Sequence, residues 1–200
     1  RVTFATGAAG DRATALTLAR KYRDGSAASR ALSMAFTHVH VTLQHLGLSD
    51  DRAILFDRLA SRLFGDDASC ISPSDLLRNT LGQSSLWQYS ISGDLPLVLL
   101  FVTDVSELPL VRQVLLAQEY WRVKGLAADV VIINEHTADY LDETQNHLMA
   151  LAHEPRWSGW NNRSGGIFLL RSDALPVSDR HLLAAVARVV LRGDRGELDT

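Results

Sequence analysis

The chain has 200 residues, of which 46% are apolar and 22% charged, as is usual for a globular protein. Its net charge of -3, without any block of Lys or Arg, predicts no nucleic-acid partner. No apolar run approaches the roughly 18 residues that cross a bilayer, so we expect this segment to make no membrane contact. The single cysteine, Cys70, excludes an internal disulfide.

The first residues have the pattern of a strand without a partner. Arg1 to Thr6 alternate between polar and apolar residues, and the pattern stops at Gly7. A lone terminal strand has no sheet of its own. We therefore predict that residues 1–10 complete the sheet of a preceding domain, and that the chain is a piece of a longer polypeptide.

Residues 11–80 are predicted to form a helical layer. Apolar residues recur at helical spacing in Arg12–Tyr22, Ser26–Leu46 and Asp50–Phe64, with Asp11 and Ser49 as caps. A short helix follows at Pro73–Arg78, because proline is well tolerated in the first helical turn.

Residues 81–200 are predicted to form a βαβαβα domain packed on this layer. Three short runs are almost entirely apolar and so fit buried parallel strands: Leu97–Val102, Asp129–Asn134 and Gly166–Arg171. Each is followed by an amphipathic stretch of helical length: Ser106–Lys124, Thr137–Ala152 and Asp179–Leu191. The predicted fold is α/β, with a small parallel sheet of at least three strands.

The segments after these strands lack the motifs of nucleotide enzymes. The first strand is followed by Thr103 to Glu107, which contains two carboxylates and no glycine to approach a phosphate. We predict no cofactor. Glu135 and His136 follow the second strand, at the edge where open α/β sheets bind ligands, so a small α/β enzyme with its site there is one alternative.

Serine hydrolase and metal sites are not indicated either. Ser92, Gly93 and Asp94 precede a strand instead of following one, which favours a structural turn over a catalytic elbow. Three histidines of one predicted helix, His38, His40 and His45, are two, five and seven residues apart and do not share a face. We predict no catalytic residue and no metal site.

The loop at residues 153–165 has the composition of a sugar-binding surface. Aromatic rings cover the C–H faces of sugars, and planar polar groups bind their hydroxyls. The candidate glucan-binding residues are Trp157, Trp160, Asn161, Asn162 and Arg163. The alternative is that the two tryptophans anchor the loop or dock on an adjacent domain.

Three long segments resemble one family of large bacterial enzymes. They are LGQSSLWQYSISGDLPLVLL from Leu81, LPLVRQVLLAQEYWRVKGLAADVVIINE from Leu108 and GGIFLLRSDALPVSDRHLLAAVARVVLRGDRGEL from Gly165. These segments, and FATGAAGDRATALTLARKYRD from Phe4, resemble the carboxy-terminal region of cyclic β-1,2-glucan synthases, which is related to glycoside hydrolase family 94.

The resemblance implies a role within a multidomain membrane protein. Such synthases transfer glucose from UDP-glucose, cyclise the glucan and control its length by phosphorolysis, on the cytoplasmic face of the bacterial inner membrane. The (α/α)6 barrel with the catalytic aspartate of family 94 does not fit into this chain, so no catalytic residue is carried over. The resemblance implies a noncatalytic inter-domain scaffold whose partners are flanking β-sandwich domains; a module that binds β-1,2-glucan is the second alternative.

Overall fold

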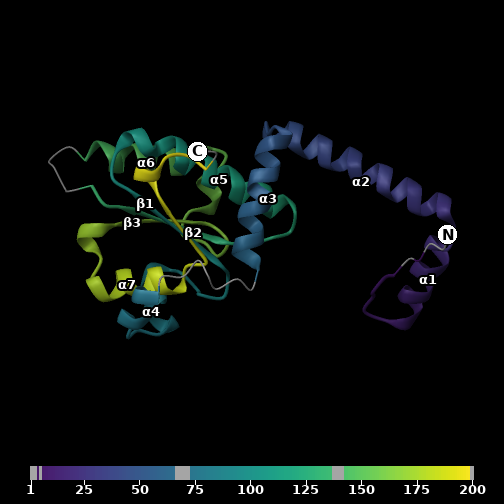
Figure 1. Cartoon of the computed structure of the whole chain (residues 1–200), viewed down its shortest axis with the longest axis horizontal. Helices are drawn as coiled ribbons and strands as arrows, with labels where there is room; N and C mark the ends of the chain where they lie inside the picture. The colour runs from purple at the N-terminus through teal and green to yellow at the C-terminus, as the bar shows by residue number, and fades with distance from the viewer. Residues whose placement is uncertain (1–3, 5, 66–72, 137–141, 199–200) are drawn as a thin grey trace. The chain divides into compact units, whose positions relative to one another are not determined.

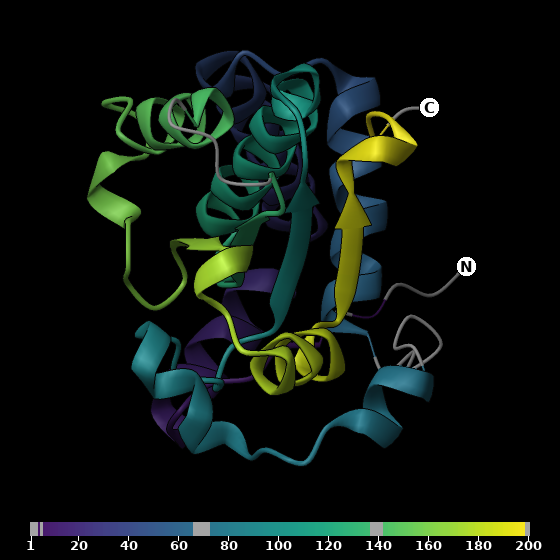
Figure 2. The ribbon, with the colours of Figure 1, turned by 90° about the vertical axis from the view of Figure 1, so that its left-hand side faces the viewer.

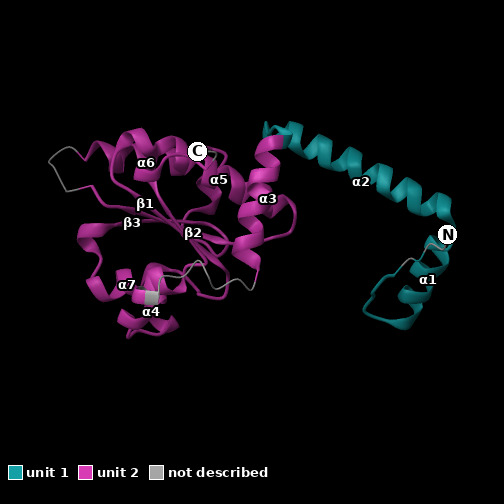
Figure 3. Cartoon of the chain, in the orientation of Figure 1, with its two compact units in different colours: residues 1–50 teal, residues 51–200 magenta. Residues whose placement is uncertain are grey.

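The structure, a computed structural model, describes residues 4, 6–65, 73–136 and 142–198. The chain divides into two compact units, residues 1–50 and 51–200 (Figure 3). The predicted helical layer at residues 11–80 therefore crosses the boundary between the units, and the packing of its residues 11–50 on the α/β domain stays a prediction. The predicted terminal strand, Arg1 to Thr6, lies mostly outside the described residues.

In the described part of the first unit, the first helix has the predicted bounds and the second begins at Gly25, one residue before the prediction. In α1 (Arg12–Tyr22), the Asp11 carboxylate accepts a hydrogen bond from Thr14 N at 2.9 Å. In α2 (Gly25–Leu46), Asp24 is the N-cap, and Gly47 ends the helix in the left-handed region at φ 68°. These caps satisfy backbone groups that the helices leave unpaired at their ends.

The second unit is built on a parallel four-stranded sheet with the order β3-β2-β1-β4. The strands are β1 (Leu97–Val102), β2 (Asp129–Asn134), β3 (Ile167–Arg171) and β4 (Val189–Arg192). The first three confirm the predicted βα units. The connections β1 to β2 and β2 to β3 advance in one direction, and the next connection returns across the sheet to place β4 on the other side of β1.

The predicted helix Asp179–Leu191 is wrong in its second half. Helix α7 (Val177–Val186) is followed by its C-cap Ala187, and β4 begins two residues after this cap. The Arg188 N–H donates to Leu97 O at 2.9 Å, which starts the pairing of β4 with β1. The β-branched pair Val189 and Val190 suits a strand, and the free edge of β1 offers hydrogen bonds that a longer helix could not make.

Helices cover both faces of the sheet. Helices α5 (Leu108–Val123) and α6 (Glu143–Ala152) lie on one face, and α7 lies on the other together with the 3₁₀ helix η2 (Gln83–Tyr89) (Figures 1 and 2). Helix α4 (Pro73–Arg78) packs against α7, and α3 (Asp50–Phe64) packs against α5. The predicted helix at Thr137–Ala152 is described only from Asp142, which caps α6.

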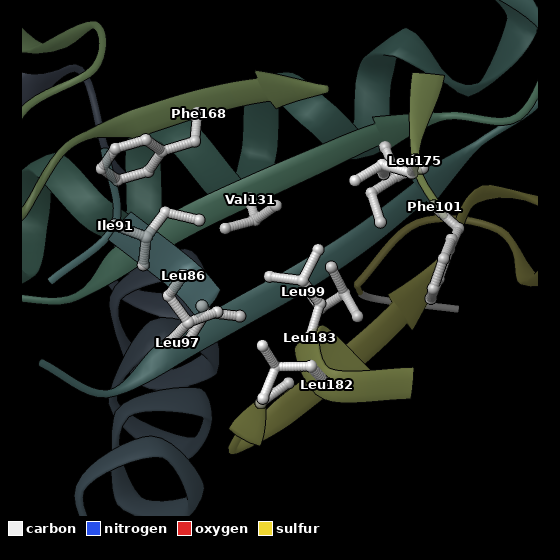
Figure 4. Packing of buried hydrophobic residues seen from close by; sticks show 12 residues of the cluster. Leu86, Ile91, Leu97, Leu99, Phe101, Val131, Phe168, Leu175, Leu182 and Leu183 are labelled. Carbon is white, nitrogen blue, oxygen red and sulfur yellow. The ribbon is translucent and has the colours of Figure 1, made fainter. Parts of the chain in front are cut away.

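The core follows the alternation of side chains along the strands. On the face covered by α7, residues 97, 99 and 101 of β1 meet residues from the neighbouring strands and helices (Figure 4). The labelled members of this cluster are Leu86, Ile91, Leu97, Leu99, Phe101, Val131, Phe168, Leu175, Leu182 and Leu183. The intervening residues of β1 are buried against the other face.

A buried polar contact fixes η2 to α7. The Asp179 carboxylate accepts hydrogen bonds from Gln88 Nε2 at 2.7 Å and from the Tyr89 hydroxyl at 2.5 Å. Burial, reinforced by this carboxylate, raises the pKa of Tyr89 to about 12. The hydroxyl therefore stays protonated and continues to donate throughout the physiological pH range.

Candidate functional site

The carboxyl ends of the four strands form the edge of the sheet where α/β proteins bind ligands. We call this the carboxyl edge; it contains Thr103 after β1, Glu135 and His136 after β2, Ser172 after β3 and Gly193 after β4. The chain leaves β1 toward β2 on one side, whereas β4 lies on the other side of β1, so the strand order reverses between β1 and β4. In open α/β sheets, the crevice at such a reversal is the expected position for a ligand.

That crevice is occupied by a side chain of the protein itself. The Glu107 carboxylate accepts hydrogen bonds from Thr103 N at 2.8 Å and from Thr103 Oγ1 at 2.6 Å. On the other side it lies against Gly193, where an added Cβ would be only 2.0 Å from Glu107 Oε2. Any larger residue at position 193 would therefore displace the Glu107 side chain, which fills the space between the ends of β1 and β4.

Glu135 and His136 are each held by neighbours in the sheet. Glu135 forms ion pairs with Arg180 of α7 and with Arg192 of β4, the latter at 3.0 Å. A ring nitrogen of His136, Nδ1, lies 3.0 Å from Thr103 O, which links the ends of β1 and β2. The sequence correctly predicts that Glu135 and His136 lie at the carboxyl edge. It does not predict that Arg180 and Arg192 pair with Glu135, because α7 and β4 come close to Glu135 only in the folded sheet.

A pocket of about 360 Å³ lies beside Glu135. Phe101 and Val177 form its apolar wall, and Glu135, Arg180 and Arg192 line its polar side. Since Glu135 is ion-paired with both guanidinium groups, none of these three side chains is an unpaired nucleophile or base. If the chain were a small α/β enzyme with its site at Glu135 and His136, this pocket would be the position of its substrate.

The rest of the carboxyl edge is a closed polar network. Asn134 Nδ2 donates to Gln145 Oε1 at 3.0 Å and lies 3.3 Å from an Asp142 oxygen. Arg171 forms ion pairs with Asp142 at 3.2 Å and with Asp173 at 2.7 Å. These groups hold the ends of β2 and β3 together, and each described member already has a partner within the chain.

In the 153–165 loop, the predicted glucan-binding residues occupy different environments. Trp157 is 2% exposed and packs beside Arg112, whose guanidinium carbon is 5.6 Å from the ring centroid. Trp160 is partly exposed, and the Arg122 guanidinium carbon lies 3.4 Å from its ring centroid. Burial lowers the pKa of Arg122, whose Nη2 has no hydrogen-bond partner.

The polar residues of the loop are partly used to hold its shape. Asn161 Nδ2 donates to Ala152 O at 2.9 Å, and Arg163 Nη1 donates to Gly159 O at 2.8 Å. Asn162 has a positive φ of 52° and, like Arg163, is exposed. Trp160, Asn162 and Arg163 thus offer side-chain surface to solvent, whereas Trp157 contributes to the core.

The Ser92-Gly93-Asp94 segment makes local turn contacts. Asp94 N donates to Ser92 Oγ at 3.2 Å, and Gly93 has a φ of 76°. Gln83 Nε2 binds both Ser92 O and Asp94 Oδ1, at 2.8 Å and 3.1 Å. Trp87, whose Nε1 lies 3.3 Å from Ser92 O, is 64% exposed.

A buried polar group at the opposite edge of the sheet was not singled out by the sequence. Asp129, at the start of β2, is fully buried, and its Oδ1 accepts from Gly165 N at 2.7 Å, while Oδ2 has no partner. Burial raises the pKa of this carboxyl above its ordinary 3.8, against the hydrogen bonds from Gly165 and Gly166. In the sequence, Asp129 is simply the polar first residue of an apolar run.

Asp129 is expected to make the stability of the second unit depend on pH. Because its pKa is raised on folding, the stability that it contributes is fully present below about pH 3.8 and is lost as the pH rises through the higher folded value. Asp129→Asn keeps an acceptor for Gly165 N and removes the charge. Urea unfolding from pH 4 to 7 should show the variant gaining stability relative to the wild type as pH rises; a difference independent of pH would contradict this.

Among the described residues, no group of three or more His, Cys, Asp or Glu is arranged to hold a metal ion. In the same part of the chain, no helix combines the length and hydrophobicity that a membrane span requires.

The comparisons with known proteins give one relationship. No family model matches the chain. It is 30% identical over 199 residues to the cyclic β-(1,2)-glucan synthase NdvB of Rhizobium meliloti, in an alignment that covers 98% of this chain. The chain spans only 7% of the length of that protein. The chain is therefore related, along nearly its whole length, to one short stretch of a bacterial cyclic β-(1,2)-glucan synthase.

Proposed function

We propose that this chain is a noncatalytic α/β segment of a cyclic β-1,2-glucan synthase and acts as a scaffold between its domains. The observation that carries the proposal is the state of the carboxyl edge. Glu107 occupies the crevice between β1 and β4, and Glu135 is neutralised by Arg180 and Arg192. A catalytic edge would instead present polar groups that are free to meet a substrate.

In this proposal, glucosyl transfer from UDP-glucose, cyclisation and phosphorolytic length control belong to other parts of the parent protein. Those parts would include the region related to glycoside hydrolase family 94, and the parent would lie at the cytoplasmic face of the bacterial inner membrane. The segment's partners would be flanking β-sandwich domains. The similarity to the Rhizobium synthase over 98% of the chain supports this placement in a larger protein.

The test is to replace Glu135 and His136, at the carboxyl edge, in a full-length synthase that carries this segment. Glu135→Gln and His136→Asn are conservative changes at the position that an enzyme would use. We expect glucan synthesis and phosphorolysis, per amount of folded protein, to stay within about twofold of the wild type. A general acid or base contributes about 100-fold or more, so a loss of that size would overturn the noncatalytic role.

A second candidate function is direct contact with β-1,2-glucan through the 153–165 loop. It is favoured by the exposure of Asn162 and Arg163 beside the partly exposed ring of Trp160. Titration of β-1,2-glucan into the 200-residue chain, followed by calorimetry, should give heat that Trp160→Ala abolishes and that Trp87→Ala leaves unchanged. Equal heats for both variants would remove this loop from consideration.

A further inference from the structure

A groove of about 430 Å³ lies along one edge of the sheet in the second unit. One wall is helix α3, and the other is β4 with the residues that follow it. We call it the edge groove. Figure 2 shows β4, in yellow, as the outermost strand with α3 beside it.

The groove follows the backbone of β4 and not one face of the sheet. Successive side chains of a strand point to opposite faces. The groove nevertheless contacts three consecutive residues, Val190, Leu191 and Arg192. This is the pattern expected of a space that lies beside the outer edge of the strand.

The outer edge of β4 carries backbone groups that point into this space. β4 pairs with β1 on one side, and no strand of the described chain lies on the other. Arg188 N donates to Leu97 O, so residues at even positions direct their N–H and C=O groups toward β1. The N–H and C=O groups of Val189 and Leu191 therefore point outward, as on any unpaired edge strand.

The side chains around the groove combine apolar surface with positive charge. Leu55 and Leu59 of α3 and Leu198 supply the apolar lining. Arg58, Arg62 and Arg195 also line it, and the described residues form no ion pair with any of these three.

The acidic groups near the groove are already engaged elsewhere. Arg192 is paired with Glu135 and Asp194. Glu197, the acidic residue of the lining, accepts a hydrogen bond from Gln113 Nε2 at 2.5 Å.

Arg58 and Arg62 are one helical turn apart on α3, a spacing at which like charges destabilise a helix by a few tenths of a kcal/mol. An anionic partner would relieve that repulsion.

We propose that the edge groove binds an acidic, extended polypeptide segment that adds a strand beside β4. Its backbone pairs with the outward groups of Val189 and Leu191, its alternate apolar side chains meet the leucines, and its carboxylates meet Arg58, Arg62 and Arg195. Strand addition of this kind obtains affinity from main-chain hydrogen bonds and specificity from alternate side chains. A nucleotide or a sugar would leave the strand edge unpaired. This inference rests on the scaffold role and names the chemistry of one partner.

The probe is a fluorescein-labelled peptide of about eight residues that alternates glutamate and valine, long enough to cover a short strand. With the 200-residue chain, we expect saturable fluorescence anisotropy that weakens as salt is raised. Arg58→Gln/Arg62→Gln should reduce affinity by about tenfold or more. The matched control, Arg12→Gln/Arg20→Gln on α1, removes the same charge and should change affinity less than about twofold.

Two further probes separate strand addition from simple attraction between charges. A lysine-valine peptide should not bind, and the glutamate-valine peptide methylated at alternate backbone nitrogens should lose most of its affinity. Absence of saturable binding by the unmodified acidic peptide, or equal binding by the methylated peptide, would overturn the proposal. Either result would leave the scaffold role standing, because that role is tested separately by the Glu135→Gln and His136→Asn activities.

Discussion

Replacing Trp121 by alanine is expected to destabilise the second unit by about 3–5 kcal/mol, the cost typical of removing a fully buried large aromatic side chain. Trp121 is 0% exposed, and its Nε1 donates to Phe56 O at 2.9 Å. Its ring also meets Phe64 edge-on, with centroids 6.4 Å apart. The substitution would leave a cavity between α3 and α5 and remove the hydrogen bond that joins them.

Urea unfolding monitored by tryptophan fluorescence measures this effect in the second unit, because the four tryptophans all lie within residues 51–200. The matched control is Trp87→Ala, since Trp87 is 64% exposed and should cost about 1 kcal/mol or less. Similar losses for the two variants would contradict the placement of Trp121 in the core.

Gln118→Met is expected to destabilise the same unit by about 2–4 kcal/mol, although the side chains are similar in size. Gln118 is 2% exposed, and the two N–H groups of its Nε2 are shared among three carbonyl oxygens: Ala128 O at 2.9 Å, Gly165 O at 3.2 Å and Gly166 O at 2.8 Å. Gly166 O keeps its other partner, Val130 N, but the remaining two carbonyls would lose the bond that this side chain makes.

The control for this prediction is Gln44→Met on the exposed surface of α2, where a change of about 0.5 kcal/mol or less is expected. Thermal and urea unfolding of both variants, followed by far-UV circular dichroism, provide the measurement. If Gln118→Met proved as mild as Gln44→Met, the carbonyls of Ala128 and Gly165 would have to find other donors, and the amide would not be what joins α5 to the starts of β2 and β3.

The candidate site shows how far local sequence can locate function. Glu135 and His136 could be placed at the carboxyl edge, because they directly follow an unmistakable buried strand. Their partners could not be found in the same way. Arg192 lies 57 residues from Glu135, and Arg180 lies 45 residues away. Which charges meet depends on strand order, and local periodicity contains no information about strand order.

The sugar-binding hypothesis illustrates a second limit. A sequence gives the composition of the 153–165 loop but not the exposure of each ring. Trp157 packs into the core, whereas Trp160 remains partly exposed beneath Arg122. Arg122 belongs to α5, far from the loop in sequence, so its stacking on Trp160 could not be anticipated from the loop itself.

Local sequence patterns were enough to predict the α/β class, the first three strands and most of the helices that follow them, and the resemblance of long segments pointed to cyclic β-1,2-glucan synthases. The fold class, strands and helices depend on apolar runs, periodic stripes and helix caps, which are properties of neighbouring residues, whereas the relationship rests on the resemblance of long segments. The assembled sheet was needed to show that residues 189–192 form a fourth strand, that Glu107 fills the crevice at Gly193 and that arginines without an ion pair among the described residues border the outer edge of β4. Each of these depends on contacts between segments distant in the chain, whose energies outweigh local preference and appear only when the sheet is assembled.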